Sequence, residues 1–329
     1  MATIKDIAKK VGVSNATVSR VLNHDEGISV SQEKREDIFR VANELGYKKK
    51  VVNPKIENVA LLYWICEEEE LQDIYFNAIF SELIEQCKQK NISLQLYKKE
   101  DGVQAIKKET NAFIAIGYFN RKELDYLQRV TSNGIFIDSA PDEKYFDSVR
   151  PNLNSIVTQI VDYLVEKEHQ KIGFIGCSDP DIETSRPTID IRESSFTQRA
   201  NYHSVYDEKA IFITDQVTVA QGYRLGQLAI EKLGDELPTA FCVASDTLAI
   251  GVLQAFHEAK IDVPSRVAFF SINDTNVSQY VSPPLTTFHI DIPLLCESAI
   301  DLLQERMIKG RQITKTVSIN GVPVFRKSC

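Results

Sequence analysis

One short stretch of the sequence carries side chains suited to reading DNA. Residues 14–20 read SNATVSR, and a helix here would present four of them on one outward face: Asn15, Ala16, Ser19 and Arg20. Asn and Arg side chains match the geometry of base edges in the major groove, and Ser and Thr hydroxyls bind phosphate oxygens. A merely solvated face would explain the polarity, but it would not explain the small Ala16 beside Asn15. The stretch therefore indicates a surface that enters a DNA groove.

Apolar spacing predicts the helices that would position this surface. Three groups recur at helical spacing: Ile4, Ile7, Ala8 and Val11; Val18, Val21 and Leu22; and Ile38, Val41, Ala42 and Leu45. Thr3, Ser14 and Ser31 can cap these helices, and Gly12 ends the first of them. Short helices joined by a turn that contains Gly form a helix-turn-helix. The sequence thus predicts an all-α, three-helix head over residues 1–47.

The charge distribution supports a division between head and body. Residues 1–50 carry 10 Lys and Arg against 7 Asp and Glu, while residues 51–329 carry 28 against 39, which gives net charges of +3 and -11. A basic module on an acidic body indicates that the module meets a polyanion. A chance fluctuation of a few charges is the alternative on charge alone. The helix pattern favours the first interpretation.

The body alternates short aliphatic strands with amphipathic helices from residue 59 onward. VALLYWI, AFIAIG, GIFID, IGFIG, AIFIT, FCVAS, VAFFSI and TTFHI read as strands, with helices expected between most of them. This alternation predicts parallel sheets covered by helices on both faces. Because some 270 residues exceed one comfortable open sheet, two α/β lobes with a cleft between them are expected.

Two segments of the head resemble a known family. TIKDIAKKVGVSNATVSRVLN, followed by VSQEKREDIFRVANELGY, is similar to the N-terminal domain of the lac/gal repressor family of bacterial transcription regulators. KIGFIG, VASDTLAIGVLQAF and SINDTNVSQYVSPPLTTF resemble landmarks of the family's body, and the stretch YWICEEEELQDIYF is most similar to galactose and β-galactoside operon repressors. The resemblance implies a periplasmic-binding-protein-like body of two parallel-sheet lobes.

The resemblance also implies which head residues touch DNA. Asn15 and Ala16 would choose the operator sequence, and the other expected contacts to bases and the DNA backbone are Thr3, Ser14, Thr17, Ser19, Arg20, Asn23 and Tyr47. The resemblance implies double-stranded operator DNA as the partner. A homodimer would present two recognition helices to a pseudo-palindromic site, and assembly beyond a dimer is left open.

The linker departs from the family pattern. Family members usually carry a hinge helix whose Leu wedges into the minor groove. Here residues 48–58 read KKKVVNPKIEN, and Pro54 disfavours a helix. Three lysines could attract phosphate in place of a wedge, and a flexible solvated linker is the alternative.

The resemblance implies that the body, residues 59–329, is an effector-binding and dimerisation domain made of two lobes. Its first lobe is expected over residues 59–152 and 288–315, and its second over residues 153–287 and 316–329. Arg192 lies where the family places an Arg that bonds the ligand, and Asp274 matches an acidic residue that grips sugar hydroxyls. Tyr75, Ser245 and Asp246 complete the expected effector site.

The identity of the effector is left open between a sugar and a sugar phosphate. At the place where sugar binders set an aromatic platform, five residues before Gly222, stands Val217. Phe76, Tyr118 or Phe288 could substitute.

Other function classes find less support. The six cysteines and five histidines are scattered, without metal or disulfide spacing, so no metal or cofactor is expected. A hydrolase would be the enzyme alternative, but GxSxG, GxGxxG and GxxxxGKS are all absent. A transport-type sugar receptor would need an export signal, and MATIKDIAKK lacks the apolar region of one. A cytoplasmic, non-enzymatic regulator without membrane spans is therefore expected.

Overall fold

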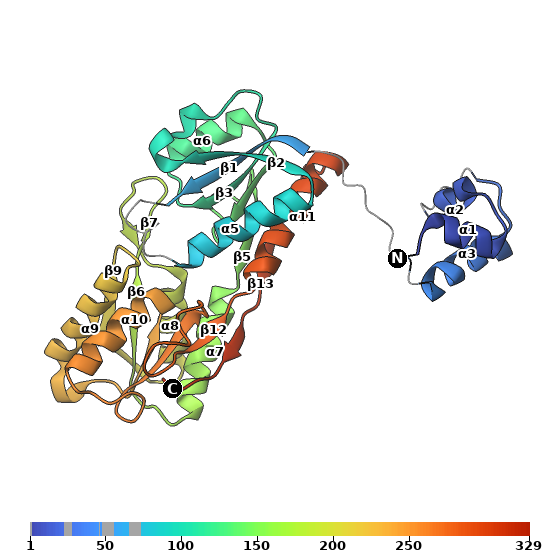
Figure 1. Cartoon of the computed structure of the whole chain (residues 1–329). Helices are drawn as coiled ribbons and strands as arrows, with labels where there is room; N and C mark the ends of the chain where they lie inside the picture. Colours follow the sequence, from blue (N-terminus) through green and yellow to red (C-terminus); the bar gives the residue numbers. More distant parts are fainter. Residues whose placement is uncertain (1, 23–27, 46, 48–55, 66–73) are drawn as a thin grey trace. The chain divides into compact units, whose positions relative to one another are not determined.

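The computed structural model describes residues 2–22, 28–45, 47, 56–65 and 74–329. The chain forms two compact units, residues 1–54 and 55–329. Figure 1 shows the first unit built from helices and the second built from two layered lobes. The all-α head of three helices and the α/β body of two lobes built on parallel sheets confirm the predicted fold class.

The head is built from α1 (Ile4–Val11), α2 (Asn15–Leu22) and α3 (Gln32–Glu44). The three apolar stripes predicted from the sequence meet in one core, in which Ile7, Val18 and Ile38 are fully buried. Gly12 ends α1 with a φ of 74°, a left-handed conformation that glycine adopts at little cost. The turn that follows delivers the chain directly into α2.

The first lobe contains a six-stranded parallel sheet in the order β13-β5-β4-β3-β1-β2. The strands are β1 (Ile56–Trp64), β2 (Ile92–Lys98), β3 (Ala112–Gly117), β4 (Gly134–Ile137), β5 (Asp147–Pro151) and β13 (Thr316–Ile319). α5 (Ile74–Gln89) and α11 (Ile292–Lys309) cover one face, and α6 (Arg121–Val130) covers the other. Short 3-10 turns η1 (Lys99–Asp101) and η2 (Val103–Ala105) follow β2.

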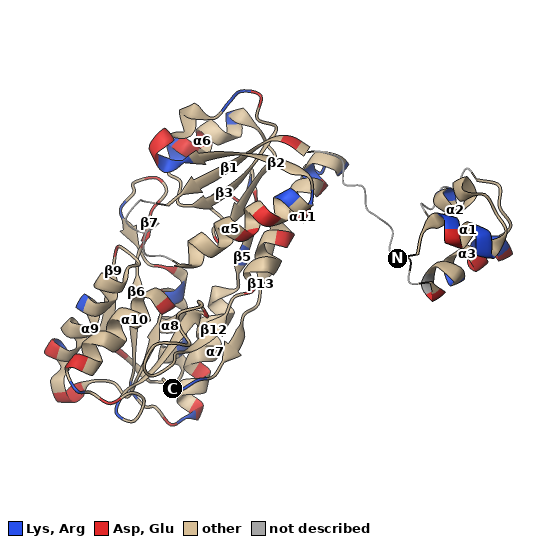
Figure 2. Ribbon diagram, in the orientation of Figure 1, with Lys and Arg blue, Asp and Glu red and all other residues tan. Residues whose placement is uncertain are grey.

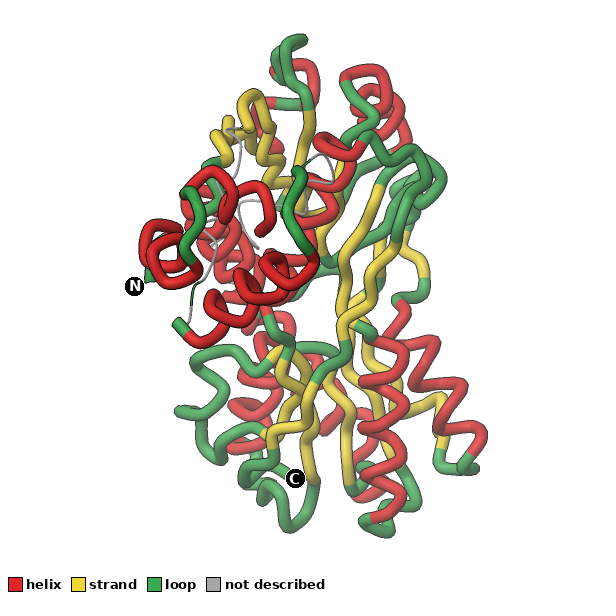
Figure 3. Tube along the Cα trace, turned by 90° about the vertical axis from the view of Figure 1, so that its right-hand side faces the viewer, coloured by secondary structure: helices red, strands yellow, loops and turns green. Residues whose placement is uncertain are grey.

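The second lobe repeats this plan in the order β14-β12-β11-β10-β6-β9, and only β14 runs antiparallel to its neighbour. Its strands are β6 (Ile172–Cys177), β9 (Tyr206–Thr214), β10 (Ala240–Val243), β11 (Ala268–Asn273), β12 (Thr286–His289) and β14 (Val322–Val324). α7 (Leu153–Glu166) and α8 (Ile191–Tyr202) cover one face, while α9 (Val219–Leu233) and α10 (Asp246–Glu258) cover the other. The turn η3 (Gly234–Glu236) follows α9. Figure 3 shows helices on both sides of the strands.

The chain crosses between the lobes three times, between β5 and α7, between β12 and α11, and between β13 and β14. Three predicted boundaries need correction. The last crossing lies after Ile319 rather than at residue 315, because β13 pairs with β5 in the first sheet, and β12 keeps Phe288 and His289 in the second. The sequence predicts a linker that extends to residue 58, but β1 begins at Ile56. Ile56 is buried and lies opposite Ile92 of β2, and the strand register shifts between Ile56 and Val59.

Candidate DNA interface and effector site

The outward face of α2 has the composition that the sequence predicted. Val18 and Val21 are fully buried, whereas Asn15, Ala16 and Arg20 are exposed. Ser19 and Thr17 are partly exposed. This face can therefore reach a DNA groove without disturbing the core beneath it.

Capping contacts fix where α2 begins. The Ser14 hydroxyl accepts a hydrogen bond from the Thr17 backbone N–H at 3.0 Å and lies 2.8 Å from the Thr17 hydroxyl. Both side chains thus have a structural role besides any contact with phosphate. The N-terminus of α2 also carries the positive end of the helix dipole, which favours a nearby phosphate.

The residues expected to contact the DNA backbone have different roles within the head. Thr3 and Asp6 form a reciprocal cap on α1, and hydrogen bonds from Thr3 lower the pKa of the Asp6 carboxyl. Tyr47 packs against the head core. Asn23 and residues 48–55, with the three lysines of the linker, lie outside the described residues.

In the body, Tyr75 identifies a polar centre in the first lobe. Tyr75 lies on α5, is only 4% exposed, and donates a hydrogen bond from its hydroxyl to Asp138 Oδ1 at 2.7 Å. Asp138 follows β4 directly and has a positive φ of 70°. Burial raises the pKa of Asp138, against the lowering effects of Tyr75 and of the Arg192 charge.

Arg192 faces this centre from the second lobe, at the start of α8. Its guanidinium forms two hydrogen bonds with Asp190, at 2.8 and 2.7 Å, and a third with the Ala244 carbonyl oxygen at 3.1 Å. The Asp190 carboxylate is itself the N-cap of α8. The Arg192 charge also acts on Asp138, the hydrogen-bond partner of Tyr75, so we assign Tyr75 and Arg192 to one candidate site between the lobes.

A third carboxylate joins the same site from a short hairpin. Asp179, at the start of β7 (Asp179–Pro180), lies close enough to Asp190 for the two charges to act on each other. Desolvation, together with the charges of Asp190 and Asp138, raises the pKa of Asp179 to about 6. Three carboxylates therefore lie within electrostatic reach of one guanidinium, and of the three Asp190 is hydrogen-bonded to it.

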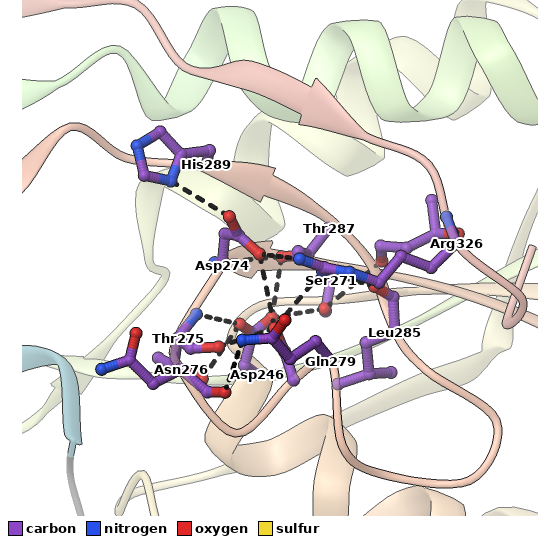
Figure 4. A network of polar contacts seen from close by, with 12 residues as sticks. Asp246, Ser271, Asp274, Thr275, Asn276, Gln279, Leu285, Thr287, His289 and Arg326 are labelled. Atoms are coloured by element: carbon purple, nitrogen blue, oxygen red, sulfur yellow. Dashed lines mark hydrogen bonds and ion pairs between the residues drawn. The ribbon is translucent and has the colours of Figure 1, made fainter.

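Ser245 and Asp246 do not present free side chains to this site, contrary to expectation. Ser245 is 2% exposed and caps α10, where its hydroxyl accepts from the Leu248 N–H at 3.3 Å. Asp246 is fully buried and accepts hydrogen bonds from Ser271, Thr275 and Thr287, as Figure 4 shows. The geometry gives both residues a supporting role.

Asp274 is occupied by partners that the sequence did not reveal. Its carboxylate pairs with Arg326 at 2.6 Å and accepts from His289 Nδ1 at 3.1 Å (Figure 4). Arg326 comes from the C-terminal segment, which is far from Asp274 in sequence. An effector that binds Asp274 would have to share it with this arginine.

The aromatic residues that could replace the missing sugar platform lie in different environments. Phe288 is 1% exposed and stacks on Phe270 at 5.6 Å, so it belongs to the core. Phe76 packs at 5.4 Å from Tyr75. The Tyr118 hydroxyl is buried without a hydrogen-bond partner among the described residues, close to the charges of Asp179 and Asp181. Val217, in place of the usual ring, packs against the second-lobe core.

Sequence reasoning missed the carboxylates Asp138, Asp179 and Asp190. Asp138 had a usable signal, because it ends the strand GIFID, and ligands of open parallel sheets bind beyond the carboxyl ends of the strands. Asp179 and Asp190 had none, since a two-residue strand leaves no hydrophobic pattern.

The described residues offer little to metal, thiol or membrane chemistry. No group of three or more His, Cys, Asp or Glu side chains is arranged there to hold a metal ion. Burial raises the pKa of four thiols to about 12, which keeps them protonated: Cys87, Cys242, Cys296 and Cys329. Within the same residues, every helix is too short or too polar to cross a bilayer.

Comparison with known proteins agrees with both units. A model of bacterial regulatory proteins of the lacI family matches residues 3–50, and a periplasmic binding protein-like domain matches residues 161–329. A ferric reductase NAD-binding model also matches residues 37–184, but this span begins within α3 and ends in the hairpin, so it coincides with no compact unit.

Whole-length relatives are transcription regulators. The chain is 46% identical over 328 residues to the HTH-type transcriptional regulator GanR of Bacillus subtilis, covering 100% of this chain and 99% of the relative. It is 35% identical over 331 residues to the HTH-type transcriptional regulator LacR of Lactobacillus helveticus, covering 100% and 98%.

Solved structures share the fold. A complex of the regulator CelR with cellobiose aligns with a TM-score of 0.72 at 19% identity, covering all of both chains. A lac repressor dimer bound to operator aligns with a TM-score of 0.66 at 20% identity, covering 99% and 98%. These regulators bind DNA rather than catalyse a reaction, and this chain belongs with them to the lacI family of bacterial regulatory proteins.

Proposed function

We propose that this transcription regulator is a cytoplasmic repressor of carbohydrate-utilisation genes that binds a pseudo-palindromic operator as a homodimer. The observation that carries the proposal is the exposed face of α2, where Asn15, Ala16 and Arg20 stand above a fully buried Val18. Asn and Arg can read bases directly, and a dimer would present two such faces one helical turn apart.

The effector that best fits the site is a neutral sugar. The site is surrounded by three carboxylates: Asp138, Asp179 and Asp190. Among the described residues the one cation near them is Arg192, which is already paired with Asp190. Carboxylates accept hydrogen bonds from neighbouring hydroxyl groups, whereas they repel a phosphate. Lactose and sucrose, in addition to cellobiose, occupy other structures of this fold at 17% and 16% identity, which supports the same ligand class.

The test combines operator selection with sugar titration. Binding-site selection from random duplexes identifies the operator, and operator affinity is then measured with galactose, lactose, cellobiose and the 6-phosphate of galactose. A neutral sugar is expected to change operator affinity, while the phosphate does not. A response to the phosphate alone would contradict the proposed ligand class.

Exchanging the two residues that are expected to choose the operator sequence tests the head separately. The double variant Asn15→Ala, Ala16→Asn is expected to select a different operator while keeping the wild-type affinity for sugar. Gln32→Ala, an exposed change on α3, is the matched control and should keep the wild-type preference. An unchanged preference in the double variant would show that α2 does not read the sequence.

A further inference from the structure

The β7–β8 hairpin of the second lobe is a compact, internally bonded projection. β7 pairs with β8 (Pro187–Thr188) in antiparallel register. At the turn, the Asp181 N–H donates to the Arg186 carbonyl oxygen at 2.8 Å, and Asp181 Oδ1 accepts from both the N–H and the hydroxyl of Thr184. The hairpin therefore holds its own shape as it extends from the sheet.

The tip of this hairpin binds the first lobe. The Arg121 backbone N–H donates to the Ile182 carbonyl oxygen at 2.8 Å, and Arg121 Nε lies 2.8 Å from Glu183 Oε1. Arg121 is held in place by Asp142 of its own lobe at 2.7 Å. The Ile182 side chain packs against the apolar cluster that contains Trp64. A backbone hydrogen bond, an ion pair and an apolar contact therefore join the hairpin tip to the first lobe at one place.

This contact lies across the body from the crossovers. In Figure 1, β7 reaches towards the first lobe on the left of the body, whereas β5, β13 and α11, which flank the crossovers, lie on the right. A pair of lobes joined by strands on one side can open on the other. The hairpin bridges the lobes on that opening side.

The base of the same hairpin belongs to the candidate effector site. Asp179 begins β7 and lies within electrostatic reach of Asp190 and of Asp138 in the first lobe. Among the described residues the buried Tyr118 hydroxyl has no hydrogen-bond partner, and burial together with the charges of Asp181, Glu123 and Asp179 raises its pKa. A ligand hydroxyl placed there would supply the bond that Tyr118 lacks.

We propose that the β7–β8 hairpin is a clasp that couples effector binding to the closure of the two lobes. Asp179 and Tyr118 add specificity-determining contacts to the effector site, and Ile182 and Glu183 fasten the hairpin to the first lobe. This inference rests on the proposed function for the identity of the site, but the clasp itself does not require a ligand. Effector escape requires release of the tip, so loosening the tip speeds escape.

The chain contains a reporter for this contact. Trp64 is its single tryptophan, is 1% exposed, and belongs to the cluster that Ile182 covers. The double variant Ile182→Ala, Glu183→Gln removes the apolar and ionic contacts of the tip. The matched control, Ile313→Ala with Glu208→Gln, makes the same changes at exposed positions outside the hairpin.

Two measurements on the full-length proteins test the clasp. Without ligand, acrylamide quenching of Trp64 fluorescence should be at least twofold stronger in the clasp variant than in wild type and control. With whichever of galactose, lactose, cellobiose or sucrose binds wild type, the variant should release the sugar about tenfold faster in stopped-flow measurements, while its operator affinity without sugar stays within twofold.

The outcomes separate the two proposals. Equal quenching in variant and wild type overturns the clasp whatever the ligand is. Enhanced quenching with an unchanged sugar release rate overturns its coupling to the site. If no sugar binds wild type, the proposed function fails while the quenching result still decides the contact. Tyr118→Phe should weaken sugar binding about tenfold without altering quenching, and unchanged affinity in this variant would remove Tyr118 from the site.

Discussion

At the scale of single residues, Asp246 shows how a buried carboxylate can support a site without touching the ligand. Its Oδ1 accepts from Thr287 at 2.7 Å, and its Oδ2 accepts from the Thr275 N–H at 2.7 Å. Thr287 in turn accepts from the Asp274 N–H at 3.3 Å. Asp246 thereby fixes the loop that presents Asp274, a positioning role that explains why it lies at the start of α10.

Burial makes Asp246 a source of pH-dependent stability. Desolvation raises its pKa from 3.8 to about 6, despite the hydrogen bonds from Ser271, Thr275 and Thr287. The folded protein then binds this proton more tightly than the unfolded chain does. Its contribution to the free energy of unfolding is therefore fully present below pH 3.8 and is lost as the pH rises through about 6.

The variant Asp246→Asn tests the direction of this pH dependence of stability. Asn resembles the protonated acid, because its oxygen can face the Thr275 N–H while its amide donates to the hydroxyls of Ser271 and Thr287. Relative to wild type, the variant should gain about 3 kcal/mol in unfolding free energy between pH 4 and pH 7. Urea denaturation at several pH values measures the difference. Parallel pH profiles for the two proteins would contradict a raised pKa.

At the scale of elements, α9 and α10 depend on close approach of their backbones. A Cβ on Gly251 would lie 2.0 Å from the Val219 carbonyl oxygen, and one on Gly222 would lie 2.1 Å from that of Leu248. Glycine at these two positions lets the helices cross in contact. That crossing sets the position of the α10 N-terminus, which carries Asp246.

Gly251→Ala should therefore destabilise the body. The added methyl group meets rigid backbone on two sides, and overpacking of this kind costs about 1–3 kcal/mol. Chemical denaturation should show this loss, while Gln254→Ala, an exposed change on the same helix, should alter stability by less than about 0.5 kcal/mol. A Gly251→Ala protein as stable as wild type would show that the crossing can relax.

The elements also show what the sequence can predict. Strands such as AFIAIG and the helix stripes of the head were predicted because their periodicity is local. β5, β13, β14, α11 and the hairpin were not predicted. β5 and β14 read DSVRP and VPV, and they are strands only because distant segments pair with them.

The candidate site divides in the same way. Arg192 and Tyr75 were located through family resemblance, and in the structure Tyr75 is hydrogen-bonded to Asp138 while the Arg192 charge acts on the same carboxylate. Asp179, Arg326 and the partners of Asp246 could not be found, since each depends on segments that meet only in the folded protein. Sequence alone identified Ser245 and Asp246 but not their burial, because a polar residue after a strand can cap a helix or face a ligand with equal ease.

At the scale of the whole molecule, charge separates the two tasks. The first 50 residues carry +3 and the rest of the chain carries -11. Figure 2 shows basic and acidic residues spread over the outer helices of the body in this view. Attraction to DNA is therefore expected from the head, while the acidic body disfavours non-specific binding.

Operator recognition by two heads also requires a surface that joins two bodies. β2 is the outer strand of the first sheet, and beside it lies a groove of about 420 Å³ lined by residues of β1, β2 and α5. Ile84 and Leu96 in this groove are each 40% exposed. An open strand edge with exposed apolar side chains is suited to self-association around a two-fold axis.

Leu96→Glu should disrupt this association. Because the axis repeats the substitution on both partners, two carboxylates would face an apolar interface, and the dimer dissociation constant should rise at least tenfold. Sedimentation velocity measures the change, and Ile313→Glu, at a side chain that is 81% exposed outside the groove, is the control. Operator affinity should fall with the dimer fraction, since one head contacts only a half-site. A Leu96→Glu protein that stays dimeric at nanomolar concentration would place the interface elsewhere on the body.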